Sequence, residues 1–277
     1  NSSLLLDRPT LAEIFAGTIT KWNHASISSL NPGVTLPDED IIRVVRSDEN
    51  AITKLFTEAL SSFSTTWNTT YGSSNEWPST PSTNLISVSE KDYESTVLDT
   101  PYSIGYAVKR GGHIYNEFDL INRSGVQVSN NVTTVRATVT SLDRTTTIGG
   151  LANKYNIQFS LIDGNRTTST WPICGFTYVM IHRDVVDDEL DCYPTKGAHG
   201  LFYYYFLTPA STSVVTGSGY HQYFTTVITN DVLPNIKCNN KAVAQLDDPK
   251  NTYSGASTFT CSVFVTMVIA LITLLFV

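Results

Sequence analysis

Hydrophobic residues recur with helical spacing in two stretches near the start of the chain. In PTLAEIFAGTITKWN, residues 9–23, Leu11, Ile14 and Phe15 share one helical face, and Pro9 stands in the first turn, where proline is favoured. In ITKLFTEALSSF, residues 52–63, the apolar side chains form a stripe with i, i+3, i+4 spacing. Its members are Ile52, Leu55, Phe56, Ala59, Leu60 and Phe63. Both stretches predict amphipathic helices.

Other apolar runs are short and β-prone, which predicts strands over 41–45 (IIRVV), 103–108 (SIGYAV), 158–163 (QFSLID) and 175–182 (GFTYVMIH). Residues 31–34 (NPGV) predict a turn, and the polar stretch 71–89 predicts a loop. GLFYYYFL, residues 200–207, fits either a strand or a helix, whereas the β-branched residues 129–141 favour a strand. Alternating strands and helices indicate an α/β protein.

The segment RSDENAITKLF, residues 46–56, has the layout of an anion-binding loop. Arg46, Ser47 and Asp48 follow a predicted strand and precede a predicted helix, whose N-terminus attracts negative charge. The turn itself, however, contains no glycine and carries the extra acid Glu49.

Composition excludes several function classes. The 277-residue chain has 41% hydrophobic residues, enough for a substantial core, and 18 basic against 25 acidic residues give a net charge of −7. Because binding to nucleic acid needs clustered cations, we expect no such partner. The histidines show no metal spacing, the acidic run at 187–191 lacks the spacing of calcium ligands, and we find no nucleophile or dinucleotide motif. We therefore expect no enzyme, no cofactor and no metal.

The C-terminus and the sequons predict a place at a cell surface. Residues 254–277 carry no charge, and small residues precede the apolar end, which is typical of a GPI-attachment signal; a retained transmembrane helix is the alternative. Five N-x-[ST] sequons predict an extracellular glycoprotein on the outer face of the plasma membrane. The sequon asparagines are Asn1, Asn68, Asn122, Asn131 and Asn165. No signal peptide opens the sequence, so we expect that the start of the exported protein is missing.

None of the four cysteines has zinc-ligand spacing. Cys261 lies in the apolar tail, and among Cys174, Cys192 and Cys238 we expect one disulfide in an oxidising compartment.

Four segments together resemble the phosphate-binding proteins of bacterial ABC uptake. They are LLLDRPTLAEIFAGTITKWNHASISSLNPGVTLP, IIRVVRSDE, DTPYSIGYAV and WPICGFTYVMIHRD, and the match runs in order from about residue 4 to 238. The resemblance implies a type II periplasmic-binding-protein-like α/β fold in a eukaryote-type relative, and it implies helices at 129–141 and 200–207.

The resemblance also implies a domain layout. Residues 1–170 would form the second lobe and 171–238 the C-terminal part of the first, followed by a polar stalk (239–256) and the membrane-anchor or GPI-signal tail (257–277). The family's first third has no counterpart here, so we expect that the chain is a fragment or that a neighbouring chain supplies the rest. Otherwise strand 175–182 would be an open edge and helix 200–207 an exposed apolar face.

In the resembling family the anion loop reads approximately Arg-Ser-Asp-Gly-Ser-Gly-Thr-Thr. Arg46, Ser47 and Asp48 match, whereas Glu49, Asn50, Ala51 and Ile52 replace the residues that supply small size and hydroxyl donors. An oxyanion that lacks its donors is costly to bury, so we predict at most weak binding of phosphate or another small anion. We interpret Glu49 as a helix-capping acid.

The resemblance further implies a Cys192–Cys238 disulfide and a buried Cys174 thiol. The predicted function is a non-enzymatic cell-surface ligand-binding module with a degenerate anion site. The alternative is a structural or adhesive surface glycoprotein, assembling with other chains, that keeps the fold without binding phosphate.

Overall fold

The computed structural model describes residues 3–109, 115–141, 162–163, 169–176, 184–185, 192–212, 233–243 and 271–276. The chain divides into two compact units, Asn1–Phe176 with Ile272–Val277, and Thr177–Leu271. This division lies close to the predicted boundary between residues 170 and 171, while the assignment of the two lobes stays a prediction.

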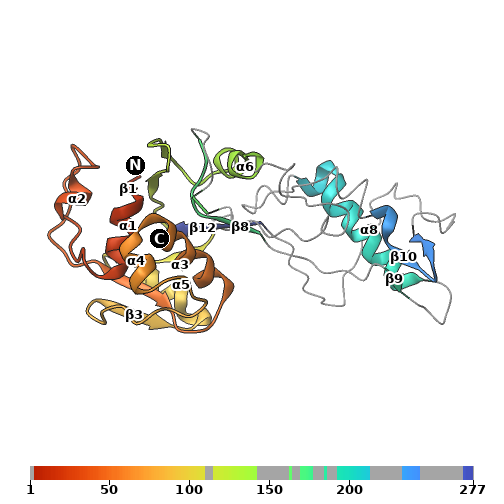
Figure 1. The fold of residues 1–277 in the computed structure, drawn as a ribbon, viewed down its shortest axis with the longest axis horizontal. Coiled ribbons are helices and arrows are strands. Elements are labelled where there is room, and N and C mark those ends of the chain that lie inside the picture. The colour runs from red at the N-terminus through yellow and green to blue at the C-terminus, as the bar shows by residue number, and fades with distance from the viewer. Residues whose placement is uncertain are drawn as a thin grey trace. The chain divides into compact units, whose positions relative to one another are not determined.

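The strand before the anion loop belongs to a parallel sheet in the first unit, of which Figure 1 labels the edge strand β3 (Leu85–Val88). The central strand β2 (Ile42–Arg46) pairs with β3 on one side and β4 (Ser103–Ile104) on the other. Helix α5 (Glu90–Asp99) contacts all three strands, and helix α3 (Ala51–Phe63) packs against α1 (Arg8–Ala16) and α4 (Thr65–Thr70). Strand β2 is buried from Arg43 to Arg46, as expected of a strand covered on both faces.

The remaining elements of this unit form two further sheets. Strand β1 (Leu5–Asp7) pairs in parallel with β6 (Asp119–Ile121), which pairs antiparallel with β7 (Gln127–Val128). Strand β5 (Tyr106–Val108) pairs antiparallel with β12 (Leu271–Phe276), and β8 (Cys174–Phe176) completes that sheet. Helices α2 (Ala25–Ser28) and α6 (Val132–Thr140) lie in the connections.

Helix α1 shows why the first predicted helix begins and ends where it does. Asp7 caps it by accepting a hydrogen bond from Thr10 N at 2.8 Å, and Pro9 occupies the first turn. Gly17 ends it in the left-handed conformation, with φ of 78° and its N–H bonded to Ile14 O. Helix α3 confirms the second predicted stripe, with Phe56, Ala59, Leu60 and Phe63 buried.

An aromatic cluster forms the centre of the first unit. The Phe56 ring lies 4.7 Å from the ring centroid of Phe15 and 4.5 Å from that of Tyr106, and Trp77 stacks 5.8 Å from Tyr106. These rings come from α1, α3, β5 and the connection before β3, so the cluster joins segments that are far apart in the sequence.

In the second unit the described elements are β9 (Asp184–Val185), α8 (Tyr193–Leu207), the short 3-10 helix η2 (Leu233–Asn235), β10 (Lys237–Cys238) and β11 (Lys241–Ala242). Strand β10 pairs in parallel with β9 and antiparallel with β11. A disulfide joins Cys192, just before α8, to Cys238 on β10, with a Cα–Cα distance of 6.0 Å. The predicted pairing is confirmed, and Cys174 is a buried free thiol, as predicted.

Helices α6 and α8 confirm the assignments that the resemblance implied for 129–141 and 200–207, so the β-branched pattern of 129–141 was misleading. The predicted loop at 71–89 is wrong in part, because residues 85–88 form β3. Most of the strands predicted at 158–163 and 175–182 lie outside the described residues.

The predicted membrane tail is described only at 271–276, where it forms strand β12. Among the described helices, none has both the length and the apolar character that a membrane crossing needs. The anchor stays a prediction.

Candidate functional site

The predicted anion loop follows strand β2 at the carboxyl edge of the parallel sheet. Arg46, the last residue of β2, lies opposite Val88, the last residue of β3, and Ser47 N donates to Val88 O at 2.8 Å. Because the two strands are parallel and in this register, the segments that follow them meet at one edge of the sheet. This edge is where ligands bind in open α/β sheets.

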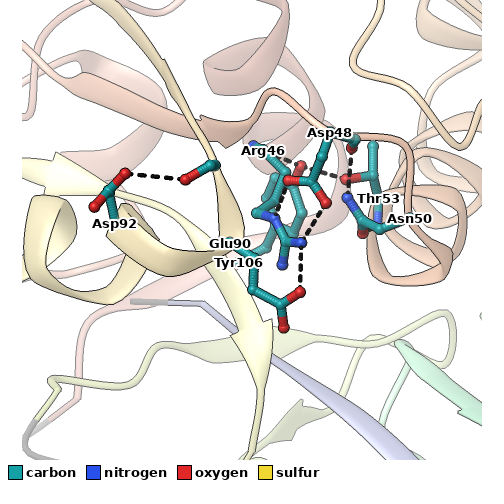
Figure 2. Close-up of polar contacts among 8 residues, drawn as sticks. Arg46, Asp48, Asn50, Thr53, Glu90, Asp92 and Tyr106 are labelled. Carbon is teal, nitrogen blue, oxygen red and sulfur yellow. Dashed lines mark hydrogen bonds and ion pairs between the residues drawn. The ribbon is translucent and has the colours of Figure 1, made fainter.

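Two carboxylates hold the Arg46 guanidinium at that edge (Figure 2). Asp48 accepts from Nε at 2.7 Å and from Nη2 at 2.5 Å, and Glu90, the first residue of α5, accepts from Nη2 at 3.1 Å. The Arg46 side chain is 7% exposed, whereas those of Asp48 and Glu90 are 39% and 72% exposed. The hydrogen bond with Asp48 raises the pKa of Arg46, and the hydrogen bond from Arg46 lowers the pKa of Asp48.

Asn50 is the N-cap of helix α3. Its Oδ1 accepts from Thr53 N at 2.8 Å, and its Nδ2 donates to Asp48 O at 2.8 Å. The side chain that replaces the family's small hydroxyl therefore holds the loop and the helix together. Ala51 is exposed at the first helical position, and Ile52 is half-buried beside it.

Glu49 does not cap the helix, so that interpretation was wrong. The residue lies one position before the N-cap, and its exposed carboxylate accepts a hydrogen bond from the Asn75 side chain. Asn75 O in turn accepts from Asn50 N at 2.9 Å, which ties the turn to the segment before β3. Glu49 is thus the second acid of the loop that carries Arg46, in addition to Glu90 on α5.

Buried tyrosine hydroxyls connect the loop to strand β5 and helix α5 through hydrogen bonds. The Tyr106 hydroxyl lies 2.7 Å from Thr53 Oγ1 and accepts from Arg46 N at 3.2 Å, so one side chain of β5 contacts both β2 and α3. Tyr93 donates to Val44 O at 3.0 Å and accepts from Tyr106 N at 2.6 Å. Burial raises the pKa of Tyr106 to about 12, so this hydroxyl stays protonated at neutral pH.

The structure thus brings Arg46, Asp48 and Asn50 together as predicted neighbours, and adds Glu90, Asn75, Thr53 and Tyr106, which the sequence analysis missed. A signal for Glu90 was present in Ser89-Glu90-Lys91-Asp92, an S-x-x-[DE] pattern that favours a helix start. Recognising β3 immediately before it would have placed Glu90 at the same sheet edge as Arg46. Among the described residues, no group of His, Cys, Asp and Glu could hold a metal ion.

The predicted glycosylation sites differ in accessibility. Asn68, on α4, and Asn131, before α6, are exposed. Asn122 is 3% exposed, donates to Thr170 O at 3.1 Å, and accepts from Ser124 N and Val126 N. A glycan on Asn122 conflicts with this geometry, because its amide nitrogen is buried within the fold. Asn1 and Asn165 lie outside the described residues.

A family model described as a PBP superfamily domain matches residues 1–206. The chain belongs to this superfamily. The phosphate-binding protein PstS of Pasteurella multocida is 29% identical over 192 residues, which cover 68% of this chain and 52% of the relative. Phosphate-binding protein PstS 3 of Mycobacterium tuberculosis is 30% identical over 201 residues, covering 68% of this chain and 50% of the relative. The chain therefore spans about half the length of the curated relatives it matches.

Solved structures agree on the fold. An ancestral soluble variant of the human phosphate binding protein has a TM-score of 0.61 at 15% identity, covering 87% of this chain and 68% of that one. A DING protein has a TM-score of 0.60 at 16% identity, covering 87% and 72%. Together with the superfamily match, these neighbours show the predicted type II periplasmic-binding-protein-like fold.

Proposed function

We propose that this chain forms part of a non-enzymatic cell-surface ligand-binding module, in which the loop 46–53 is a degenerate site for phosphate or a related small oxyanion. The observation that carries the proposal is the buried Arg46 guanidinium at the carboxyl edge of the sheet, next to the N-terminus of α3. The similarity of the chain to phosphate-binding proteins supports the choice of ligand class.

Charge and donors explain why the binding would be weak. Arg46 contributes one positive charge, whereas Asp48, Glu49 and Glu90 contribute three negative charges around the same loop. The side chain of Asn50 is engaged in capping, and Ala51 and Ile52 supply no side-chain donor. An oxyanion would depend on Arg46, on the exposed Ser47 hydroxyl and on backbone N–H groups. We expect a dissociation constant no better than about 1 mM, or roughly −4 kcal/mol.

Titration of the full chain with inorganic phosphate, followed by NMR and calorimetry, tests the proposal. We expect millimolar or weaker binding that Arg46→Ala abolishes and that Arg46→Lys also loses, because lysine cannot present the planar fork. Arg123→Ala, which removes an exposed cation elsewhere, is the control and should leave binding unchanged. Micromolar affinity, or binding that survives Arg46→Ala in a folded variant, would contradict the proposal.

The second candidate is a structural or adhesive surface glycoprotein that keeps the fold without binding phosphate. The excess of acid around Arg46 and the exposed sequons at Asn68 and Asn131 favour it. The same titration separates the two functions, because a structural glycoprotein would show no saturable phosphate binding that depends on Arg46. In both, the predicted tail would hold the module at the outer face of the plasma membrane, and a neighbouring chain or further segment would complete it.

A further inference from the structure

Resting on the proposed function, we infer that Glu90 lowers the anion affinity of the loop, because it is an internal carboxylate that competes with an external oxyanion for Arg46. The inference starts from how the guanidinium is used. A guanidinium offers donors in a fixed planar fork, and carboxylates and phosphates bind it best when they engage two N–H groups along one edge.

Asp48 occupies one such edge of Arg46. It accepts from Nε and Nη2, which form the side-on edge of the guanidinium. Because Asp48 is only two residues from Arg46, both belong to the same loop. The other edge, formed by Nη1 and Nη2, is the one left for a ligand. Figure 2 shows Asp48 and Glu90 approaching the guanidinium at different positions.

Glu90 contacts that remaining edge. Its Oε2 accepts from Nη2 at 3.1 Å, whereas Nη1 has no hydrogen-bond partner among the residues that the structure describes. A phosphate that engaged Nη1 and Nη2 together would meet the Glu90 carboxylate at Nη2. It would have to displace that carboxylate and tolerate its negative charge nearby.

The position of Glu90 is set by the fold, while its side chain is readily displaced. The residue is the first of α5 and follows β3, whose register with β2 brings it to the sheet edge beside Arg46. Its side chain is 72% exposed and makes one 3.1 Å contact with the arginine. Because the Glu90 carboxylate is exposed, this ion pair is weak, and an anion at high concentration can replace Glu90 without unfolding the loop.

The consequence is that Glu90, one of the three acids around Arg46, competes directly for the edge that an oxyanion would use. Asp48 differs from Glu90, because it accepts from Nε and Nη2 along the side-on edge and holds the guanidinium in place. Removing the charge of Glu90 should therefore improve phosphate binding, whereas removing Asp48 would disturb the arginine itself.

The test compares phosphate titrations of the full wild-type chain, Glu90→Gln and Glu94→Gln. Glu94 is an exposed acid one turn further along α5, so its substitution makes the same charge change on the same helix. We expect Glu90→Gln to bind inorganic phosphate about three- to tenfold more tightly than wild type, and Glu94→Gln to stay within about twofold of it. Unchanged affinity in Glu90→Gln, or an equal gain in both variants, would overturn the inference.

A double variant separates this inference from the proposed function. If Arg46→Ala removes the affinity gained by Glu90→Gln, the gain acts through Arg46, as inferred. If the gain persists in the folded double variant, phosphate binds elsewhere, and both the role of Glu90 and the proposed function fail. Binding that depends on Arg46 in wild type, without any gain in Glu90→Gln, would contradict the inference alone.

Discussion

Two arginines of one short strand have opposite surroundings. Arg43 and Arg46 lie three residues apart on β2 and therefore project to opposite faces. Arg43 donates to Phe15 O at 2.9 Å and to Pro81 O and Thr83 O at 2.7 Å each, so backbone carbonyls hold it, and burial lowers its pKa. Arg46 is held by carboxylates. Arg43 is thus a structural cation, whereas Arg46 is placed where a ligand could exchange with Glu90.

The ion pair of Arg46 with Asp48 predicts a pH dependence of stability. The folded pKa of Asp48 is lowered, so its contribution is present above the unfolded pKa of about 3.9 and is lost as the pH falls through the lower folded pKa. We expect Asp48→Asn to cost about 1 kcal/mol near pH 7, a modest value because Asp48 is partly exposed.

Denaturant unfolding of the wild type and of Asp48→Asn between pH 7 and pH 2 measures this effect. The difference in unfolding free energy should shrink below pH 4. If the difference in unfolding free energy stays constant down to pH 2, the charge of the Asp48 carboxylate does not contribute to stability.

At the scale of elements, the anion loop is held by hydrogen bonds between segments that the sequence separates widely. Tyr106 on β5 reaches Arg46 N on β2 and Thr53 on α3, and Tyr93 on α5 reaches both Val44 and Tyr106. Both tyrosines are almost fully buried. The loop geometry therefore depends on two strands, β2 and β5, and two helices, α3 and α5.

Tyr106→Phe tests this support. The variant removes the acceptor for Arg46 N and the partner of Thr53 Oγ1 while keeping the ring in the aromatic cluster, and we expect a loss of about 1–3 kcal/mol in unfolding free energy. Tyr102→Phe is the control, since Tyr102 is 48% exposed, and it should change stability by less than about 0.5 kcal/mol. Equal stability of the two variants would show that the buried hydroxyl contributes nothing.

At the scale of the whole molecule, the two units are stabilised differently. The first unit has the parallel sheet and the aromatic cluster. In the second, the Cys192–Cys238 disulfide lies within a buried cluster that includes Leu233, Ile236 and Val243. The disulfide spans 46 residues, so it removes much conformational freedom from the unfolded second unit.

Replacing Cys192 and Cys238 by alanine should destabilise the second unit by about 4 kcal/mol on the chain-entropy model. The four tryptophans, Trp22, Trp67, Trp77 and Trp171, all belong to the first unit, so their fluorescence follows that unit. We expect hydrogen exchange in α8 to accelerate strongly while the fluorescence transition keeps its midpoint. Unchanged exchange in α8 would contradict the stabilising role, and a matching fall in the fluorescence midpoint would show that the two units unfold together.

The sequence by itself determined the parts of this protein that depend on local patterns. Helical spacing predicted α1 and α3, and the apolar run at 41–45 predicted β2. The family resemblance predicted the fold, the helices α6 and α8, and the disulfide. The same patterns placed Arg46, Asp48 and Asn50 in one loop, because these residues are neighbours in the chain.

Only the tertiary structure decided what surrounds that loop. Glu90 reaches Arg46 because β3 pairs in parallel with β2, and this pairing joins residues separated by 44 positions. The burial of Asn122 follows in the same way from its contact with Thr170, 48 positions away. Local residue patterns do not predict such contacts, because the contacts depend on strand register and on packing between segments that are distant in the sequence.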